Sequence, residues 1–194
     1  MPKTPFDRSY WVVPGKFLAG YYPGDRHKDA MERKLRGLLD CGIRCVINLM
    51  EPEERDHDGL PFLDYVPVLK RHTDGGQPVE CRRMAIRDLH VPSRERMVQI
   101  LDLIDASLNE NRSVYVHCWG GRGRTGTVAG CWLARHGMAD AENVLDKIRE
   151  LRRLDLKAQW PSPETPSQIQ MVQSWKKDEL SVRHKNGRTH LGCC

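Results

Sequence analysis

One segment of the sequence combines a nucleophile, an arginine and several glycines at short spacing. Cys118 follows a β-rich run at residues 113–117, and five residues, three of them glycine, separate it from Arg124. Glycines permit a tight turn whose backbone N–H groups point inward, and such a nest binds anions. The guanidinium of Arg124 can donate two parallel hydrogen bonds to one phosphate, which a lysine cannot do. The segment is therefore typical of a phosphate cradle with a thiol at its floor.

The same surroundings make Cys118 a candidate nucleophile. A thiol beside an arginine and at the start of a helix ionises more readily than an ordinary thiol, and the thiolate is the reactive form. Thr125 follows the arginine, and its hydroxyl is placed to donate to the sulfur. We expect Cys118 to attack a phosphorus atom held by the loop. The predicted phosphate-binding residues are Trp119, Gly120, Gly121, Arg122, Gly123 and Arg124.

The pattern His117-Cys118-x5-Arg124-Thr125 resembles the signature of the cysteine-dependent protein tyrosine phosphatase superfamily. The chain length and the short loops are similar to those of its compact dual-specificity branch. The resemblance extends over about residues 16–180. It implies the cysteine phosphatase fold, hydrolysis of phosphomonoesters through a phosphocysteine intermediate, supporting roles for His117 and Thr125, and no metal or other cofactor.

Phosphate ester cleavage also needs a proton for the departing oxygen, and Asp88 is the candidate general acid. It lies in a loop that contains Pro92 and follows a predicted strand at residues 84–87. This position resembles that of the acid-loop aspartate of the superfamily. A solvated turn aspartate is the structural alternative for Asp88. Asp102 and Asp105 are weaker candidates for the acid, because they lie on the predicted polar face of a helix.

Gln168 supports two interpretations. The segment at residues 162–168 resembles a late loop whose glutamine orients the attacking water in many members of the superfamily. The pair Thr165-x-x-Gln168 is equally typical of a capping box that begins a helix. The sequence leaves both roles open.

Other phosphate-binding motifs fit the glycine-rich segment less well. Gly121-x-Gly123-x-x-Gly126 matches the dinucleotide fingerprint, but the acidic residue expected about 20 positions later, after a second strand, has no counterpart. A mononucleotide-binding loop would need Gly-Lys-Ser/Thr, which is missing. A structural cysteine in a glycine turn, or a phosphate-binding module without catalysis, remains as an alternative. The joint presence of Cys118, Arg124 and Asp88 disfavours both.

The composition of the 194 residues, with 39% hydrophobic and 29% charged residues, is typical of a soluble globular protein. The longest apolar run, at residues 128–134, is far shorter than a membrane span and contains Gly130. We therefore expect no stable membrane insertion, and the polar N-terminus indicates no signal peptide. The net charge of +5 favours an anionic partner without indicating nucleic acid. Seven irregularly spaced cysteines favour a reducing, cytoplasmic location.

Strands and helices alternate along the predicted domain. This alternation predicts an α/β fold with a central, largely parallel sheet flanked by helices. We expect an N-terminal segment at residues 1–15, a phosphatase domain at 16–180 and a basic, flexible tail at 181–194. Strands are predicted at 16–22, 43–50, 62–69, 84–87 and 113–117, and helices at 25–41, after Ser93, at 124–136, 139–153 and 166–180.

The substrate is less clearly indicated than the reaction. We expect a phosphorylated protein first, with an inositol phosphate or phosphoinositide as the alternative. A basic residue at Arg122 and an arginine-rich stretch at residues 82–96 favour the alternative. A reactive thiolate also invites redox control, for which Cys45 and Cys81 are candidate partners. The sequence does not indicate the oligomeric state.

Overall fold

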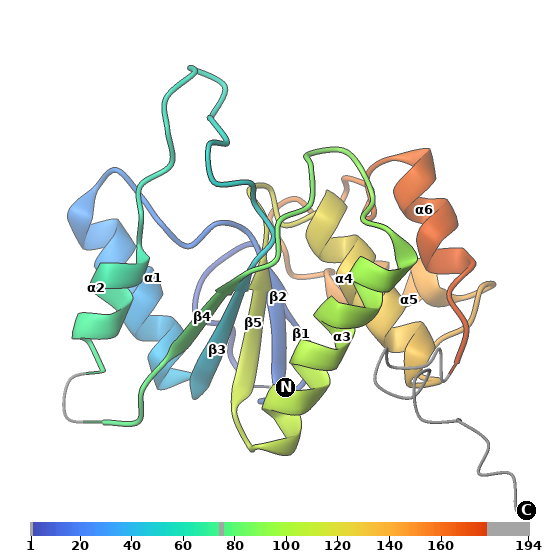
Figure 1. Ribbon diagram of the computed structural model, residues 1–194, viewed down its shortest axis with the longest axis horizontal. Helices are drawn as coiled ribbons and strands as arrows, with labels where there is room; N and C mark the ends of the chain where they lie inside the picture. Colours follow the sequence, from blue (N-terminus) through green and yellow to red (C-terminus); the bar gives the residue numbers. More distant parts are fainter. Residues whose placement is uncertain (1, 74–75, 178–194) are drawn as a thin grey trace, which may run out of the picture.

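A five-stranded sheet with strand order β1-β2-β5-β3-β4 forms the centre of the computed structural model, which describes residues 2–73 and 76–177 (Figure 1). β1 runs antiparallel to β2, and all other neighbouring strands are parallel. The predicted α/β fold with a largely parallel sheet is therefore confirmed. The strands are β1 (Ser9–Val13), β2 (Phe17–Gly20), β3 (Ile43–Asn48), β4 (Glu80–Arg83) and β5 (Ser113–His117).

Helices cover both faces of the sheet. α1 and α2 lie on one side, and α3 to α6 lie on the other (Figure 1). Burial on both faces explains why the inner strands read as continuous apolar runs and not as alternating ones. The helices are α1 (Lys28–Asp40), α2 (Val66–Arg71), α3 (Arg94–Asn109), α4 (Gly123–Arg135), α5 (Val144–Leu151) and α6 (Pro166–Gln173).

The middle strand β5 positions the cysteine. Val114, Tyr115 and Val116 are completely buried. His117, its last residue, lies beside Gly20 at the end of β2 and Asn48 at the end of β3. The carboxyl ends of parallel strands therefore meet at one edge of the sheet, where open α/β folds place their ligand sites. Cys118 is the first residue beyond this edge.

The strand predicted at residues 62–69 is wrong, because the structure has the helix α2 at Val66–Arg71. Pro67 suggested a broken strand, but it occupies the first turn of α2. A helix tolerates proline there, since the first N–H groups have no partner within the helix. A short apolar run does not by itself distinguish a strand from a helix.

Several boundaries also differ from the prediction. β4 precedes the predicted strand at residues 84–87, although the amides of Met84 and Ile86 still donate to the carbonyls of Asn48 and Leu49. β1 was not predicted; its residues pair with β2 and are mostly buried. α5 and α6 are shorter than expected. The predicted end of the domain at Leu180 and the tail at 181–194 lie outside the described residues.

Candidate active site

The loop between β5 and α4 is held from outside by its carbonyl groups. The carbonyl of Trp119 accepts the amide of Tyr22 at 3.1 Å, and that of Gly120 accepts Nη2 of Arg8 at 2.8 Å. Oγ of Ser162 donates to the carbonyl of Arg122 at 2.8 Å. Because these carbonyls point outward, the intervening amides turn toward the centre of the loop. The first residues of α4 add the positive end of the helix dipole.

Gly121 is required by the path of this loop. Its φ of +73° lies in the left-handed region that favours glycine. A Cβ at this position would also lie 2.7 Å from backbone atoms of Gly20 and Tyr21. Any side chain here would therefore push the loop away from β2.

Cys118 lies at the floor of the loop and is 2% exposed. The amide of Gly121 donates to its sulfur at 3.3 Å. The expected donation from Thr125 to the sulfur is wrong. Oγ1 of Thr125 donates to the carbonyl of Gly20 at 3.2 Å instead, because this buried hydroxyl faces the end of β2.

Arg124 is buried in the first turn of α4, and Glu54 holds it in a fixed orientation. Its Nη1 and Nη2 donate to the two carboxylate oxygens of Glu54 at 2.6 and 2.7 Å. Nη1 also donates to the carbonyl of Ile86 at 3.1 Å, and Nη2 lies 2.9 Å from the carboxylate of Asp88. Burial by itself disfavours the charged guanidinium, but the hydrogen bonds of Glu54 and the nearby charges of Cys118, Glu54 and Asp88 together outweigh it and raise the pKa of Arg124. The arginine is therefore a permanent cation.

One donor of Arg124 is left for a ligand. Within the described part of the chain, its buried Nε has no hydrogen-bond partner. A buried donor without a partner costs free energy, so such an atom calls for an explanation. An oxyanion seated in the loop would satisfy it. Glu54 was missed from the sequence, although the acidic stretch that contains it follows β3 directly, next to β5.

Asp88 meets Arg124 from a separate loop. Figure 1 shows that the segments after β3 and β4 project from the same edge of the sheet, above the start of α4. The Asp88 side chain is 46% exposed, which leaves it able to move and to meet a substrate. The loop itself is fastened, since its Leu89 carbonyl accepts Oγ1 of Thr165 and its His90 carbonyl accepts Nε2 of Gln168.

Gln168 adopts the capping arrangement. Its side-chain Oε1 accepts hydrogen bonds from the backbone N–H groups of Glu164 and Thr165. The backbone N–H of Gln168 donates to Oγ1 of Thr165. Its Nε2 donates to the carbonyl of His90 at 3.2 Å. Both ends of the side chain are therefore occupied by backbone groups. Gln168 joins the start of α6 to the loop of Asp88, and this contact favours a positioning role over the orientation of a water.

His117 is buried beneath Cys118 and is neutral. Its Nε2 lies 2.6 Å from the hydroxyl of Tyr65, and its Nδ1 lies 3.2 Å from the carbonyl of Cys118. These contacts fit a ring that donates from Nδ1 and accepts from Tyr65. Burial lowers the pKa of His117 to about 3.

The low pKa of His117 predicts a loss of stability in mild acid. The pKa of this histidine in the unfolded chain is near 6.5. Below that pH the imidazole is protonated in the unfolded chain but stays neutral in the folded protein. The free energy of unfolding should fall by about 2 kcal/mol from about pH 7.5 to pH 5 on this account. Urea titrations at several pH values should show a shallower dependence for His117→Gln. The same pH dependence of the free energy of unfolding in both proteins would contradict the low pKa of His117. The carboxylates with lowered pKa, Asp25, Asp56 and Glu80, titrate at lower pH.

A pocket of about 430 Å³ opens above the loop. Besides the predicted residues it contains groups from distant segments, which sequence reasoning missed because no local pattern marks them. Residues that line it are Arg8, His57, Asp88, Leu89, Cys118, Trp119, Gly120, Arg122, Gly123, Arg124, Lys157, Trp160 and Glu164.

The predicted basic rim takes a different form. Arg122 forms an ion pair with Glu164, and its guanidinium lies 4.7 Å from the ring centre of Trp160. The carboxylate of Glu164 therefore compensates much of its charge. The arginines at residues 82–96 do not line the pocket, and Arg82, for example, pairs with Glu80. Arg8 and Lys157 supply positive charge in their place.

The sheet register places the proposed redox partners far from Cys118. Cys45 lies three residues before Asn48, which is paired with His117. At about 3.3 Å per residue, Cys45 is about 10 Å or more from Cys118. Cys81 pairs with Val46, two strands away from β5. A disulfide requires Cα atoms within about 7 Å, so neither cysteine can trap Cys118 in this fold.

In the described ranges, 2–73 and 76–177, no helix combines the length and apolar character of a membrane span.

Comparison with known proteins agrees with this geometry. The model of the family described as "Polymorphic toxin system, DSP-PTPase phosphatase" matches residues 23–138, more than half of the chain. The matched stretch contains Asp88, Cys118 and Arg124.

Two of the curated relatives are phosphatases whose names indicate different substrates. The chain is 34% identical over 126 residues to the phosphatidylglycerophosphate phosphatase PTPMT1 of Arabidopsis thaliana, covering 63% of this chain and 34% of that protein. It is 28% identical over 142 residues to the dual specificity protein phosphatase CDC14B of Mus musculus, covering 69% of this chain and 26% of that protein. The chain thus spans about a third or less of these two relatives.

The fold is shared with solved phosphatases. The crystal structure of Tk-PTP in the active form aligns with a TM-score of 0.63 at 24% identity, covering 87% of this chain and 96% of that chain. With the family match and the Cys118 loop, the chain belongs to the DSP-PTPase phosphatase family, a dual-specificity-like branch of the cysteine-dependent protein tyrosine phosphatase superfamily.

Proposed function

We propose that this protein hydrolyses phosphomonoesters through a phosphocysteine intermediate on Cys118. The observation that carries the proposal is the convergence of a sulfur, the amide of Gly121 and a buried arginine with an unpartnered Nε at one end of a parallel sheet. The amides of residues 119–124 and Arg124 would hold three phosphoryl oxygens. These groups are oriented before the substrate arrives, which is the condition for stabilising transition-state charge.

In the first step the Cys118 thiolate attacks phosphorus while the ester bond on the opposite side breaks. The departing oxygen takes a proton from Asp88, whose exposed carboxyl faces the pocket. In the second step Asp88 accepts a proton from water as that water attacks the phosphocysteine. Inorganic phosphate leaves, and the thiolate is regenerated.

Two classes of phosphomonoester are candidates for the substrate. Similarity to CDC14B supports a phosphorylated protein, and similarity to PTPMT1 supports the phosphate of a lipid headgroup. Arg8 and Lys157 on the pocket wall favour a substrate that carries negative charge beyond the scissile phosphate. Headgroup phosphates and acidic phosphopeptides both satisfy this condition.

The role of Asp88 predicts a dependence on the leaving group. Asp88→Asn should lower kcat/KM, which reports the first step alone, by about 10²–10³-fold for an alkyl phosphate, because a poor leaving group needs the proton. An aryl phosphate with an acidic phenol should lose much less. Initial rates on both substrates, measured in the presence of a chelator, test this prediction and the proposed function together. Asp58→Asn, at an exposed position in the loop after β3, is the control.

The outcomes separate the two questions. If the wild type hydrolyses neither phosphate, the phosphatase proposal is wrong and a binding role gains support. If the wild type is active and Asp88→Asn affects both substrates equally, the reaction stands but Asp88 is not the acid.

A further inference from the structure

The segment after α5 exposes large apolar side chains beside the pocket. Residues 153–161, called the rim segment here, include Leu154 and Leu156, which are 86% and 70% exposed, and Trp160, which is 45% exposed. Leaving three such side chains in water within seven residues has no benefit for the fold. Apolar groups gathered in this way mark an interaction surface.

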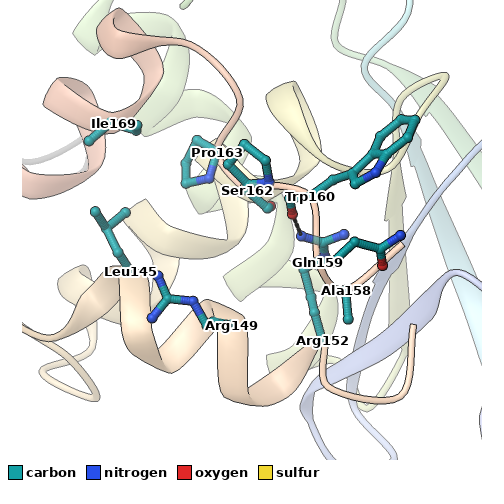
Figure 2. A pocket seen from close by; sticks show the side chains of 10 residues that line it. Leu145, Arg149, Arg152, Ala158, Gln159, Trp160, Ser162, Pro163 and Ile169 are labelled. Carbon is teal, nitrogen blue, oxygen red and sulfur yellow. Dashed lines mark hydrogen bonds between the residues drawn. The ribbon is translucent and has the colours of Figure 1, made fainter. Parts of the chain in front are cut away.

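The acidic group of the rim segment is hidden from this surface. Asp155 is 8% exposed, and its Oδ2 pairs with the buried Arg152 at 3.1 Å. Arg152 also donates to the carbonyls of Lys157 and Trp160 at 3.1 and 3.0 Å. This contact with Trp160 is the dashed line in Figure 2. Arg152 therefore fixes the backbone of the rim segment and keeps its carboxylate inside.

The charges that remain at the surface of the rim segment are positive. Arg153 is exposed, and within residues 2–73 and 76–177 it forms no ion pair with a carboxylate. Nζ of Lys157 lies 4.5 Å from the ring centre of Trp160. Leucine, tryptophan, arginine and lysine together form the composition that binds the headgroup region of an anionic bilayer.

The rim segment is continuous with the catalytic pocket. Lys157 and Trp160 line that pocket together with Cys118 and Arg124. A second cavity of about 250 Å³ lies beside Trp160, between residues 158–163 and the side chains of Leu145 and Ile169. In Figure 2 the indole of Trp160 points away from these two side chains. A surface that receives the rim segment would therefore lie against the mouth of the pocket.

We propose that the rim segment docks on an anionic membrane surface and that the substrate is a phosphate monoester on a lipid headgroup in that surface. This inference rests on the proposed phosphatase function and names its substrate class. Leu154, Leu156 and Trp160 enter the headgroup region, while Arg153 and Lys157 meet the anionic headgroups. The pocket then receives the phosphate without extraction of the lipid.

The exposed groups favour a bilayer over a protein partner. Leu154 and Leu156 project into water and line neither the catalytic pocket nor the cavity beside Trp160. Arg153 and Lys157 are their neighbours in the chain and Asp155 is buried, so the charge of the rim segment itself is complementary to an anionic surface. A fluid surface accepts such side chains without shape complementarity.

The test is cosedimentation with phosphatidylcholine vesicles, with and without phosphatidylglycerol, using the full chain. The wild type should bind the anionic vesicles. The double variant Leu154→Ser, Leu156→Ser should bind at least about ten-fold more weakly, from the lost apolar burial. Arg153→Glu should weaken binding to anionic vesicles by at least about five-fold. Met138→Ser, at a 51% exposed position beyond the far end of α4, is the matched control and should bind like the wild type.

Enzyme assays complete the test. The double variant should hydrolyse a soluble aryl phosphate at the wild-type rate but lose at least about ten-fold on a phosphatidylglycerophosphate in vesicles. The docking proposal would be overturned if the wild type did not cosediment with anionic vesicles, or if the double variant bound them as strongly as the wild type. A double variant impaired on a phosphotyrosyl peptide, with no vesicle binding by the wild type, would identify a protein surface instead. The soluble assay reports failure of the phosphatase proposal separately.

Discussion

Replacement of Cys118 by serine should abolish hydrolysis while the loop keeps its affinity for oxyanions. A serine hydroxyl is almost entirely protonated near neutrality, so the nucleophile is lost, whereas Gly121 and Arg124 stay in place. We expect kcat to fall by at least about 10⁴-fold. Steady-state assays on an aryl phosphate measure the loss, and calorimetric titration with tungstate measures the retained binding.

A trapped intermediate distinguishes covalent catalysis from simple loss of shape. Wild-type protein quenched in acid during turnover should carry phosphate on Cys118, and Cys118→Ser should carry none. Cys41→Ser is a suitable control, because Cys41 lies at the end of α1, outside the loop. Near-normal hydrolysis by Cys118→Ser would eliminate the phosphocysteine mechanism.

Arg124→Lys should be the second most damaging substitution. A single ammonium cannot bond both oxygens of Glu54 and also donate to the phosphate from two nitrogens, as the guanidinium can from Nε and, once Asp88 is displaced, from Nη2. Loss of one preorganised donor to a transition state costs about 10²–10³-fold, and here two donors are altered. We expect kcat/KM on an aryl phosphate to fall by about 10³-fold or more, with weaker tungstate binding.

Glu54→Gln provides the comparison for this prediction. It keeps the arginine and one of the two acceptor oxygens, so it loosens the guanidinium without removing it. We expect a smaller loss in kcat/KM than for Arg124→Lys, and tungstate affinity closer to that of the wild type. If Arg124→Lys retains activity within ten-fold of the wild type, the guanidinium is not the principal phosphate ligand.

Asp88 lies against the same guanidinium that Glu54 holds. In the structure its carboxylate rests 2.9 Å from Arg124, on the same Nη2 that bonds Glu54. A dianionic phosphate would compete with Asp88 for this cation. Binding of the phosphate would therefore release the Asp88 carboxyl from Arg124. The carboxyl could then turn toward the leaving oxygen, which needs a proton.

Much of the proposed reaction could be predicted from the sequence, because the groups that would carry it out are close together in the chain. Cys118, the glycines and Arg124 lie within seven residues, and a glycine-rich turn between a strand and a helix has few possible geometries. The strand at Ser113–His117 and the helix begun by Ser93 were likewise predicted, since apolar patterns and caps act locally.

No local sequence pattern predicted the contacts between segments that are distant in the chain. Glu54 meets Arg124 because Asn48 and His117 end side by side in the sheet, and Glu164 compensates Arg122 because α6 starts near the loop. Tyr65 reaches His117 from a segment that was predicted as a strand. Residue types and spacing identify which groups can react, since the required donors and acceptors are covalently close. Which charges remain available to a substrate depends on strand order and helix packing, because burial and ion pairing are settled between elements that are far apart in the chain.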